Sequence, residues 1–345
     1  MKNSIRKVIY TGLKKKFKRI KLKRHLKISI KIAAPNMKGA STWGDYHFAL
    51  ALKKEFEKKN HETVVHTVSQ WNENDDGDIV LVLRGLNKYK PKADQFNIMW
   101  NISHPDLVSV EEYNEFDYVF VASDIWADEL KTKVKVPVES LIQCADPELF
   151  YPEVSEEYKH DILFVGNSRK VFRKIVKDLL PTDKDFGLYG GLWDQFIDKK
   201  YIKGRHIKNT ELHKAYSSCK ILLNDHWEDM AEKGFISNRL FDGFAAGAFI
   251  ISDEIKGAEE LFGNALVTYS GADELHELID YYLVNDLERV KKAEKGRKIV
   301  LADHTFEKRA ERILEVINGE LSKDLIQKKE IFIKDVDNKK SKLKT

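Results

Sequence analysis

The chain has 345 residues, of which 42% are hydrophobic and 33% are charged, enough to bury a large core in about two domains of ordinary size. No apolar run approaches the roughly 18 residues of a transmembrane helix, and the N-terminus lacks the apolar region of a signal peptide. We therefore expect a soluble, cytoplasmic protein. The spacing of Cys144 and Cys219 supports neither a disulfide framework nor a zinc site, and we expect both thiols to be buried.

The net charge of +4 is unevenly distributed along the chain. Residues 1–27 carry twelve Lys or Arg and no acid, residues 322–345 carry eight Lys and four acids, and the body between them therefore has a net charge of −12. A phosphate backbone needs clustered cations on the surface that docks it. The acidic body argues against such a surface, and we expect no nucleic-acid partner.

The basic arm, defined as residues 1–27, has apolar residues at helical spacing between its lysines: Ile9, Leu13, Phe17 and Ile20. This pattern is typical of an amphipathic segment on an anionic membrane surface, which would place the protein on the inner face of the plasma membrane. A solvated basic leader explains the composition equally well. RNA binding by the arm alone is a third alternative.

Residues 28–150 alternate between apolar runs and helical patterns, which predicts a first Rossmann-like domain. Continuous apolar strands are typical of a parallel sheet that is covered on both faces. Helical periodicity is found at 46–60 and 124–133. Strands are predicted at 27–34, 62–68, 78–85, 96–103, 118–123 and 138–144.

A second Rossmann-like domain is predicted over 156–303, after a boundary marked by two prolines and a cluster of charges. A closing helix at 304–321 and a basic tail at 322–345 follow. The fold class is therefore α/β, with two tandem Rossmann-like domains facing a central cleft and helices at the C-terminal end. Strands are predicted at 162–167, 185–191, 201–206, 220–225 and 264–269, helices at 170–180, 210–219, 272–283 and 285–301, and a helix and strand within 234–253.

Two loops of the first domain carry residues suited to acid–base chemistry. Gly44, Asp45 and His47 precede a predicted helix, and Asp45 is a candidate base and also a candidate N-cap. His104 and Asp106 follow a predicted strand in "SHPD", where they form a candidate base and a substrate hydrogen-bonding group, or a surface turn.

Anion binding is predicted at the first loop of the second domain. Gly166, Asn167 and Ser168 join a predicted strand to a predicted helix, and Arg169 follows. Amides at a helix N-terminus together with a guanidinium form an anion site, most often for phosphate. The glycines match neither G-x-G-x-x-G nor a P-loop, so a nicotinamide cofactor and P-loop nucleotide hydrolysis lack their usual fingerprint.

A second polar cluster spans the end of one predicted strand and the start of the next helix, and comprises Asn224, His226, Asn238, Arg239 and Asp242. Several carboxylates lie in the same segment, but their spacing matches no known metal motif. We therefore expect no metal and no cofactor.

The segment "LNDHWEDMAEKGFISNRLFDGFAAGAFIISD" resembles the donor-binding region of glycosyltransferases of the two-Rossmann GT-B fold, in particular the CgeB-like group with its "R-x-F-[DE]-x-x-A-x-G" core. "VLRGLNKYKP", "MWNISHPD" and "LFVGNSR" are also similar to that group, so the resemblance runs from about 28 to 318. It implies transfer of a sugar from a nucleotide-sugar donor to a glycan or lipid-linked acceptor, in bacterial cell-surface polysaccharide synthesis.

The resemblance also implies roles for individual residues. The second domain would hold the donor, with Ser168, Arg169 and Arg239 facing its diphosphate, Asp242 on ribose or sugar hydroxyls, and Arg205 to Ile207 near the base. The first domain would hold the acceptor, near Gly44 and Asp106. Fixed cations stabilise the negative charge of a leaving diphosphate without a metal.

The sequence departs from the pattern at one position. Retaining enzymes of this fold carry two glutamates separated by seven residues; the second falls on Asp242 and the first on Gly234, with Glu232 out of register. The stereochemistry is therefore open. Inversion requires a base, for which Asp45 ranks before His104 and His47; with retention these residues would bind acceptor or sugar. A nucleotide-sugar epimerase of the same fold and a non-catalytic nucleotide-sugar or RNA-binding module are the alternatives.

Overall fold

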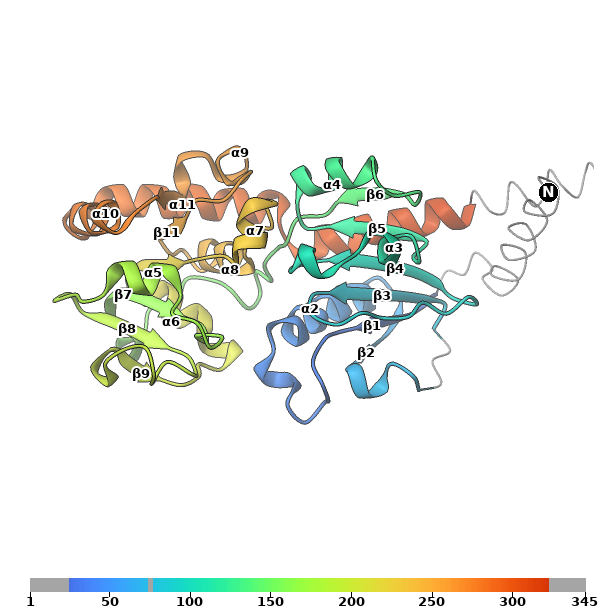
Figure 1. The fold of residues 1–345 in the computed structure, drawn as a ribbon, viewed down its shortest axis with the longest axis horizontal. Helices are drawn as coiled ribbons and strands as arrows, with labels where there is room; N and C mark the ends of the chain where they lie inside the picture. The colour runs from blue at the N-terminus through green and yellow to red at the C-terminus, as the bar shows by residue number, and fades with distance from the viewer. Residues whose placement is uncertain (1–24, 74–76, 323–345) are drawn as a thin grey trace, which may run out of the picture.

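A computed structural model describes residues 25–73 and 77–322. These residues form two parallel six-stranded sheets, one after the other along the chain (Figure 1). Most of the basic arm and the tail from residue 323 lie outside the described residues, so the amphipathic arm stays a prediction. Leu26 is buried and the first strand begins at Lys27, so the end of the predicted arm belongs to the first domain.

The first sheet has the strand order β2-β1-β3-β4-β5-β6. Every neighbouring pair in it is parallel, as predicted from the continuous apolar runs. The strands are β1 (Lys27–Lys31), β2 (Glu62–His66), β3 (Ile79–Arg84), β4 (Phe96–Asn101), β5 (Tyr118–Val121) and β6 (Val138–Ser140), and the helices are α2 (Gly44–Lys58), α3 (Val110–Tyr113) and α4 (Asp124–Lys131).

The second sheet has the order β12-β11-β10-β7-β8-β9 and is also parallel throughout. Its strands are β7 (His160–Val165), β8 (Phe186–Tyr189), β9 (Ile202–Gly204), β10 (Cys219–Asn224), β11 (Ile250–Asp253) and β12 (Val267–Tyr269). Its helices are α5 (Lys174–Leu179), α6 (Leu212–Ser218), α7 (Glu228–Glu232), α8 (Asn238–Ala245), α9 (Ala258–Phe262), α10 (Ala272–Val284) and α11 (Asp286–Asp303).

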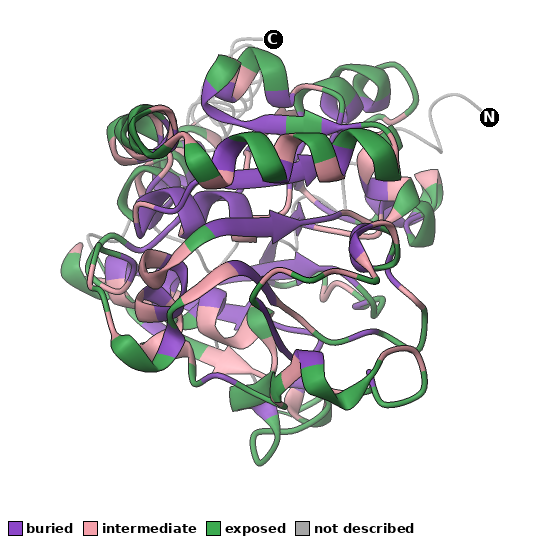
Figure 2. Ribbon diagram, turned by 90° about the vertical axis from the view of Figure 1, so that its left-hand side faces the viewer, coloured by how far each residue is buried: buried purple, intermediate pink, exposed green. Residues whose placement is uncertain are grey.

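Burial explains why these sequences form central strands. All six residues of β3 and all six of β4 are buried, because helices and loops cover both faces of the sheet. Figure 2 shows buried strands in the middle of the molecule and exposed outer faces on the helices around them. No helix among the described residues is both long and apolar enough to cross a membrane. The expected burial is found for Cys144, whereas Cys219 is only partly buried.

A final helix at 306–322 returns from the second domain to the first. Phe306, Ile313 and Ile317 pack into the core of the first domain, and the helix lies along that domain in Figure 1. The chain passes between the two domains twice, and the two connecting segments are hydrogen-bonded to each other. The Ala145 amide donates to His304 O at 3.0 Å, and the Phe306 amide donates to Ala145 O at 3.2 Å. The predicted closing helix therefore fastens the two domains together.

Candidate functional site: a cleft between the two domains

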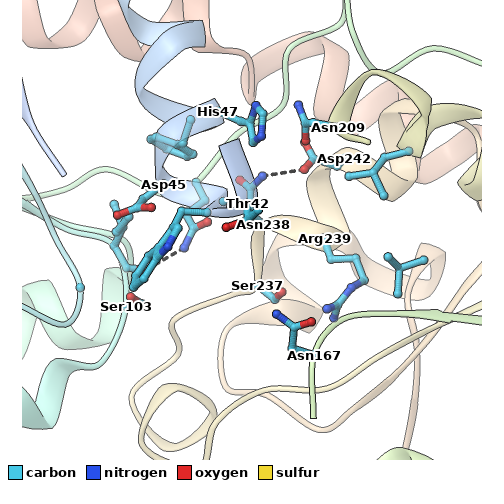
Figure 3. A pocket seen from close by; sticks show the side chains of 18 of the residues that line it. Thr42, Asp45, His47, Ser103, Asn167, Asn209, Ser237, Asn238, Arg239 and Asp242 are labelled. Carbon is cyan, nitrogen blue, oxygen red and sulfur yellow. Dashed lines mark hydrogen bonds between the residues drawn. The ribbon is translucent and has the colours of Figure 1, made fainter. Parts of the chain in front are cut away.

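A cleft of about 870 Å³ lies between the domains and is lined by residues of both. Its lining includes residues just beyond the carboxyl ends of β1, β4, β7 and β10, which is where open α/β sheets bind ligands. Figure 3 shows Asp45 and Ser103 on one wall and Asn167, Ser237 and Arg239 on the other. The predicted central cleft is thus present.

Three guanidinium groups gather on the second-domain wall around Gly166. A Cβ built on Gly166 would lie 2.9 Å from an Nη atom of Arg173 and 2.9 Å from one of Arg239, so a larger residue there would displace both guanidiniums. Both guanidiniums also lie over the Phe164 ring, at 4.7 Å for Arg173 and 5.2 Å for Arg239. The third group is Arg169, whose positive charge is repelled by both Arg173 and Arg239.

Desolvation, and then repulsion by Arg173 and Arg239, lowers the pKa of Arg169 to about 9, so the side chain still carries its charge at neutral pH. Arg169 lies over the Trp227 ring at 4.6 Å and has no ion pair with a described residue. Arg173 is buried and its Nε donates to Asp225 Oδ2 at 3.0 Å. Of the three arginines only Arg173 is ion-paired with a described carboxylate, and the positive charge of the other two favours an anionic ligand.

The loop that carries Arg169 differs from the prediction of a helix at 170–180. Residues 166–173 form an irregular loop with Arg169 and Lys170 at φ of 60° and 65°, and α5 begins only at Lys174. Several long-range contacts hold the loop, among them the hydrogen bond from Ser168 Oγ to Leu192 O at 2.5 Å and the ion pair of Arg173 with Asp225. The predicted row of free helix amides at Ser168 is therefore absent, and arginines supply the positive charge.

Asn238 and Asp242 form a polar pair one helical turn apart at the start of α8. Asn238 Nδ2 donates to Asp242 Oδ2 at 2.7 Å (Figure 3). The Oδ1 atom of each residue is buried and accepts no hydrogen bond from a described residue. Burial raises the pKa of Asp242 well above its usual range. Buried acceptors without donors are costly, so this pair is suited to hydroxyl groups of a ligand.

On the first-domain wall, the Asp45 carboxylate accepts a hydrogen bond from the backbone. Its Oδ2 accepts the amide of Ala33 at 2.9 Å, its Oδ1 is buried, and burial raises the pKa of the carboxyl. The residue lies in the first turn of α2, whose N-cap is Trp43, so the predicted capping role is wrong by two residues. His47 Nε2 is 2.8 Å from Ser41 O, and both side chains line the cleft next to Gly44.

Among the first-domain candidates, His104 has the side chain with the fewest hydrogen bonds to described residues. Neither ring nitrogen makes a hydrogen bond with a described residue, and the backbone is left-handed at φ 51°, a strained conformation that is typical of functional positions. Desolvation lowers the pKa of His104, which keeps the imidazole neutral at physiological pH. Its ring lies 5.8 Å from that of Trp227, so Trp227 contacts both His104 and Arg169.

The cleft brings together ten of the predicted site residues: Gly44, Asp45, His47, His104, Asn167, Arg169, Arg205, Asn238, Arg239 and Asp242. Arg205 is at the mouth, 76% exposed and 3.3 Å from Asp194. Six others do not line it. Asp106 is ion-paired with Lys233 across the domain interface, Ile207 is buried in the core, and Gly166, Ser168, Asn224 and His226 lie behind the wall.

Sequence reasoning missed several cleft residues. Trp227 follows β10 directly, in "NDHWED", and an aromatic residue just after a strand end was the available signal. Ser103, Asn209 and Ser237 also line the cleft, but nothing in their local sequence distinguishes them from ordinary turn residues.

Residues 168–315 match a protein-family model described as "Glycosyl transferase-like". This match covers the arginine loop, α8 and most of the second domain. No curated protein sequence matches the chain.

Solved structures match the whole two-domain arrangement. Sucrose-phosphate synthase from Thermosynechococcus elongatus superposes with a TM-score of 0.66 at 12% identity, covering 86% of this chain and 99% of that one. The chain has the GT-B fold. Anabaena HepE in complex with UDP-glucose gives 0.61 at 12% identity, covering 86% and 100%. An alpha-glucosyltransferase in complex with UDP-glucose and DNA gives 0.59 at 11% identity, covering 85% and 99%.

These matches confirm the predicted GT-B fold and the predicted glycosyltransferase-type second domain. None of them names the CgeB-like group, which stays a prediction.

Among the described residues no three His, Cys, Asp or Glu side chains are grouped closely enough to hold a metal ion.

Gly234, at the place of the first glutamate in retaining GT-B enzymes, lies outside the cleft lining. It ends the turn after α7 with φ of 71°, and a Cβ there would lie 2.9 Å from Lys256 O and 3.1 Å from Ser123 Oγ. Ser123 Oγ donates to the neighbouring Lys233 O at 2.6 Å, so this turn docks on the first domain. Position 234 is an interdomain turn and holds no room for a glutamate side chain.

Gly234→Ala should therefore destabilise the protein by about 1–3 kcal/mol, the usual cost of a strained backbone position. Differential scanning calorimetry would show a Tm lowered by several degrees. Gly271→Ala is the matched control, because a Cβ at Gly271 meets nothing within 4 Å, and its Tm should stay close to that of the wild type. Equal Tm values for the two variants would contradict the assignment.

Proposed function

We propose that the protein is a glycosyltransferase that moves a sugar from a nucleoside-diphosphate sugar on the second domain to an acceptor hydroxyl held by the first. The observation that carries this proposal is the adjacency of two chemistries in one cleft. Arg169 and Arg239 offer cations for a diphosphate, and Asn238 and Asp242 offer buried oxygens for hydroxyl groups. A nucleotide-sugar is an anion flanked by hydroxyl-rich rings, and it satisfies both.

In the proposed reaction the acceptor oxygen attacks the anomeric carbon while the bond to the diphosphate breaks. The diphosphate then carries more negative charge, which Arg169 and Arg239 stabilise from fixed positions, without a metal. If the configuration inverts, the acceptor hydroxyl needs a base. His104 suits this role better than Asp45, because its imidazole is neutral and free of hydrogen bonds to described residues, whereas Asp45 binds the Ala33 amide.

The acceptor that we propose is a glycan or a lipid-linked glycan of the bacterial cell surface. Its support is the motif "RLFDGFAAG", which resembles the CgeB-like group, and the basic arm at the N-terminus. The fold itself does not favour one acceptor, because structures that share it include a sucrose-phosphate synthase and an alpha-glucosyltransferase bound to DNA.

A thermal-shift screen tests donor binding. The screen would compare UDP, ADP, GDP and CDP and their sugars, beginning with UDP-glucose because the HepE and alpha-glucosyltransferase structures contain it. One nucleotide class should raise Tm by several degrees, since a ligand at 100 times its Kd adds about 2.7 kcal/mol. No shift with any nucleotide would refute the proposal.

Proton NMR of the donor with protein and no acceptor separates transfer from epimerisation. Without an acceptor, a transferase leaves the donor unchanged or slowly hydrolyses it to free sugar and nucleoside diphosphate. Conversion of the donor into its epimer would show that the epimerase alternative is correct.

The basic arm leads to a separate prediction. Deleting residues 1–24, which leaves Leu26 and β1 in place, should release the protein from anionic phosphatidylglycerol vesicles at about 0.15 M salt, because about 1 kcal/mol per basic residue is lost. Co-sedimentation measures the bound fraction, and neutral phosphatidylcholine vesicles are the control. Unchanged binding to anionic vesicles would refute a membrane role for the arm.

A further inference from the structure

Behind the second-domain wall, five hydrogen bonds join six groups into a chain that the backbone from Ser237 to Arg239 closes, and we call it the support ring. The ring begins and ends on the first turn of α8, at the Ser237 amide and the Arg239 guanidinium. Its other members come from the carboxyl ends of β10 and β11. The ring consists of Ser237 N–H, His226, Asp253, Ser252, Asn224 and Arg239.

One arm of the ring holds Arg239. Its Nη1 donates to Asn224 Oδ1 at 2.6 Å, and Asn224 Nδ2 donates to Ser252 Oγ at 2.9 Å. The Ser252 hydroxyl in turn donates to Asp253 Oδ1 at 2.9 Å. Asn224 and Ser252 are fully buried, so this arm fixes the direction in which the guanidinium reaches the cleft.

The other arm holds the start of the helix. His226 Nδ1 lies 2.6 Å from Asp253 Oδ1, and the Ser237 amide donates to His226 Nε2 at 2.9 Å. An Nε2 atom that accepts requires the proton on Nδ1, which then donates to Asp253. The His226 side chain has no exposed surface, so its two nitrogens are committed to the ring.

Asp253 joins the two arms as an ionised carboxylate. Burial pushes its pKa upward, but hydrogen bonds from His226 and Ser252 outweigh this effect and lower the pKa below its usual range. The backbone amide of His226 also donates to Asp253 Oδ2 at 2.8 Å. Both arms therefore donate toward Asp253, which accepts from His226 on one side and from Ser252 on the other.

From this geometry we propose that His226 and Ser252 are positioning residues for the donor diphosphate, acting through Ser237 and Arg239. Neither residue lines the cleft, whereas Ser237 and Arg239 both do (Figure 3). The proposal rests on the proposed function, because it assigns the ring to the site where the diphosphate binds. It also changes the prediction for His226, which supports the donor site from behind and does not touch the donor.

Isothermal titration of the full chain with inorganic pyrophosphate and with UDP tests the ring. His226→Asn keeps a donor toward Asp253 but cannot reach the Ser237 amide, and should raise both Kd values by about tenfold, the worth of one buried hydrogen bond. His226→Gln, whose side-chain oxygen reaches further, should restore most of that affinity. Amide hydrogen exchange in peptides covering 235–241 should be faster in His226→Asn than in the wild type, because the Ser237 amide loses its acceptor. It should stay near the wild-type rate in His226→Gln.

Ser252→Ala opens the ring on the Arg239 arm and leaves His226 intact, so it provides a second, independent variant. It should weaken pyrophosphate binding about threefold to tenfold in the wild type and by less than about twofold in Arg239→Ala, because the two changes remove the same interaction. Purely structural damage would instead give additive losses.

The outcomes separate the two proposals. Wild-type protein that binds neither pyrophosphate nor UDP would overturn the diphosphate site and, with it, this inference. Wild-type binding that His226→Asn and Ser252→Ala leave unchanged, or additive losses in the Arg239→Ala background, would overturn the ring's role alone.

Discussion

Replacing Arg239 by alanine should weaken UDP binding by roughly 10²-fold and slow sugar transfer by about 10²–10³-fold, with the fold retained. Removal of a buried, charge-assisted contact to phosphate costs about 2–5 kcal/mol, and loss of one group that stabilises developing negative charge costs about 10²–10³ in rate. Titration calorimetry measures the first effect. The release of nucleoside diphosphate from the donor measures the second.

Arg239→Lys should recover part of the affinity, because it keeps the charge but loses the planar fork that reaches both Asn224 and a phosphate. The control is Arg312→Ala, which breaks an exposed pair with Glu139 far from the cleft lining and should bind UDP normally. Near-normal binding by Arg239→Ala, with normal circular dichroism, would remove the basis for the diphosphate site.

Asp242→Asn should give a more stable protein that binds its donor at least tenfold more weakly. The pKa of Asp242 is raised by burial, so the fold favours the protonated carboxyl and loses stability as pH rises through that pKa. Asparagine stays neutral at every pH. At pH 7.5 the variant should therefore melt about 2–4 °C above the wild type, the shift that about 1 kcal/mol produces.

The gain in Tm should disappear below about pH 4, where Asp is protonated in the unfolded chain as well. Donor hydroxyls that donate to the Asp242 carboxyl favour its ionised form in the complex, which offers two acceptor oxygens where an amide offers one, so donor affinity falls in the variant. Asp128→Asn, at an exposed side chain that pairs with Lys131 outside the cleft lining, is the matched control and should change neither property. An Asp242→Asn protein with wild-type donor affinity would show that the ligand hydroxyls bind elsewhere.

The fold could be predicted from the sequence because each central strand is a continuous apolar run. "IVLVLR" and "FNIMWN" lie in the middle of the first sheet, and a parallel sheet buried on both faces requires such runs. The helix predicted at 170–180 begins late for a reason that local pattern does not contain. Arg173 pairs with Asp225, 52 positions away, and this contact holds the preceding loop away from the helical conformation.

The candidate site was predictable in its residues and less so in their roles. Asn238, Arg239 and Asp242 all lie at the start of one helix, so the motif alone placed them near one another. His226 was grouped with them as a donor-binding residue, but its two ring nitrogens are used by Asp253 and Ser237. The contact between His104 and Trp227 joins two domains, and no sequence spacing records which side chains meet across a cleft.

The most direct test of a donor site in this cleft is a crystal structure of the protein with the nucleoside diphosphate selected by the thermal-shift screen. We expect phosphate oxygens within hydrogen-bonding distance of the Arg169 and Arg239 guanidiniums, and ligand hydroxyls on Asp242 and Asn238. A nucleotide bound with its phosphates away from both arginines would contradict this expectation.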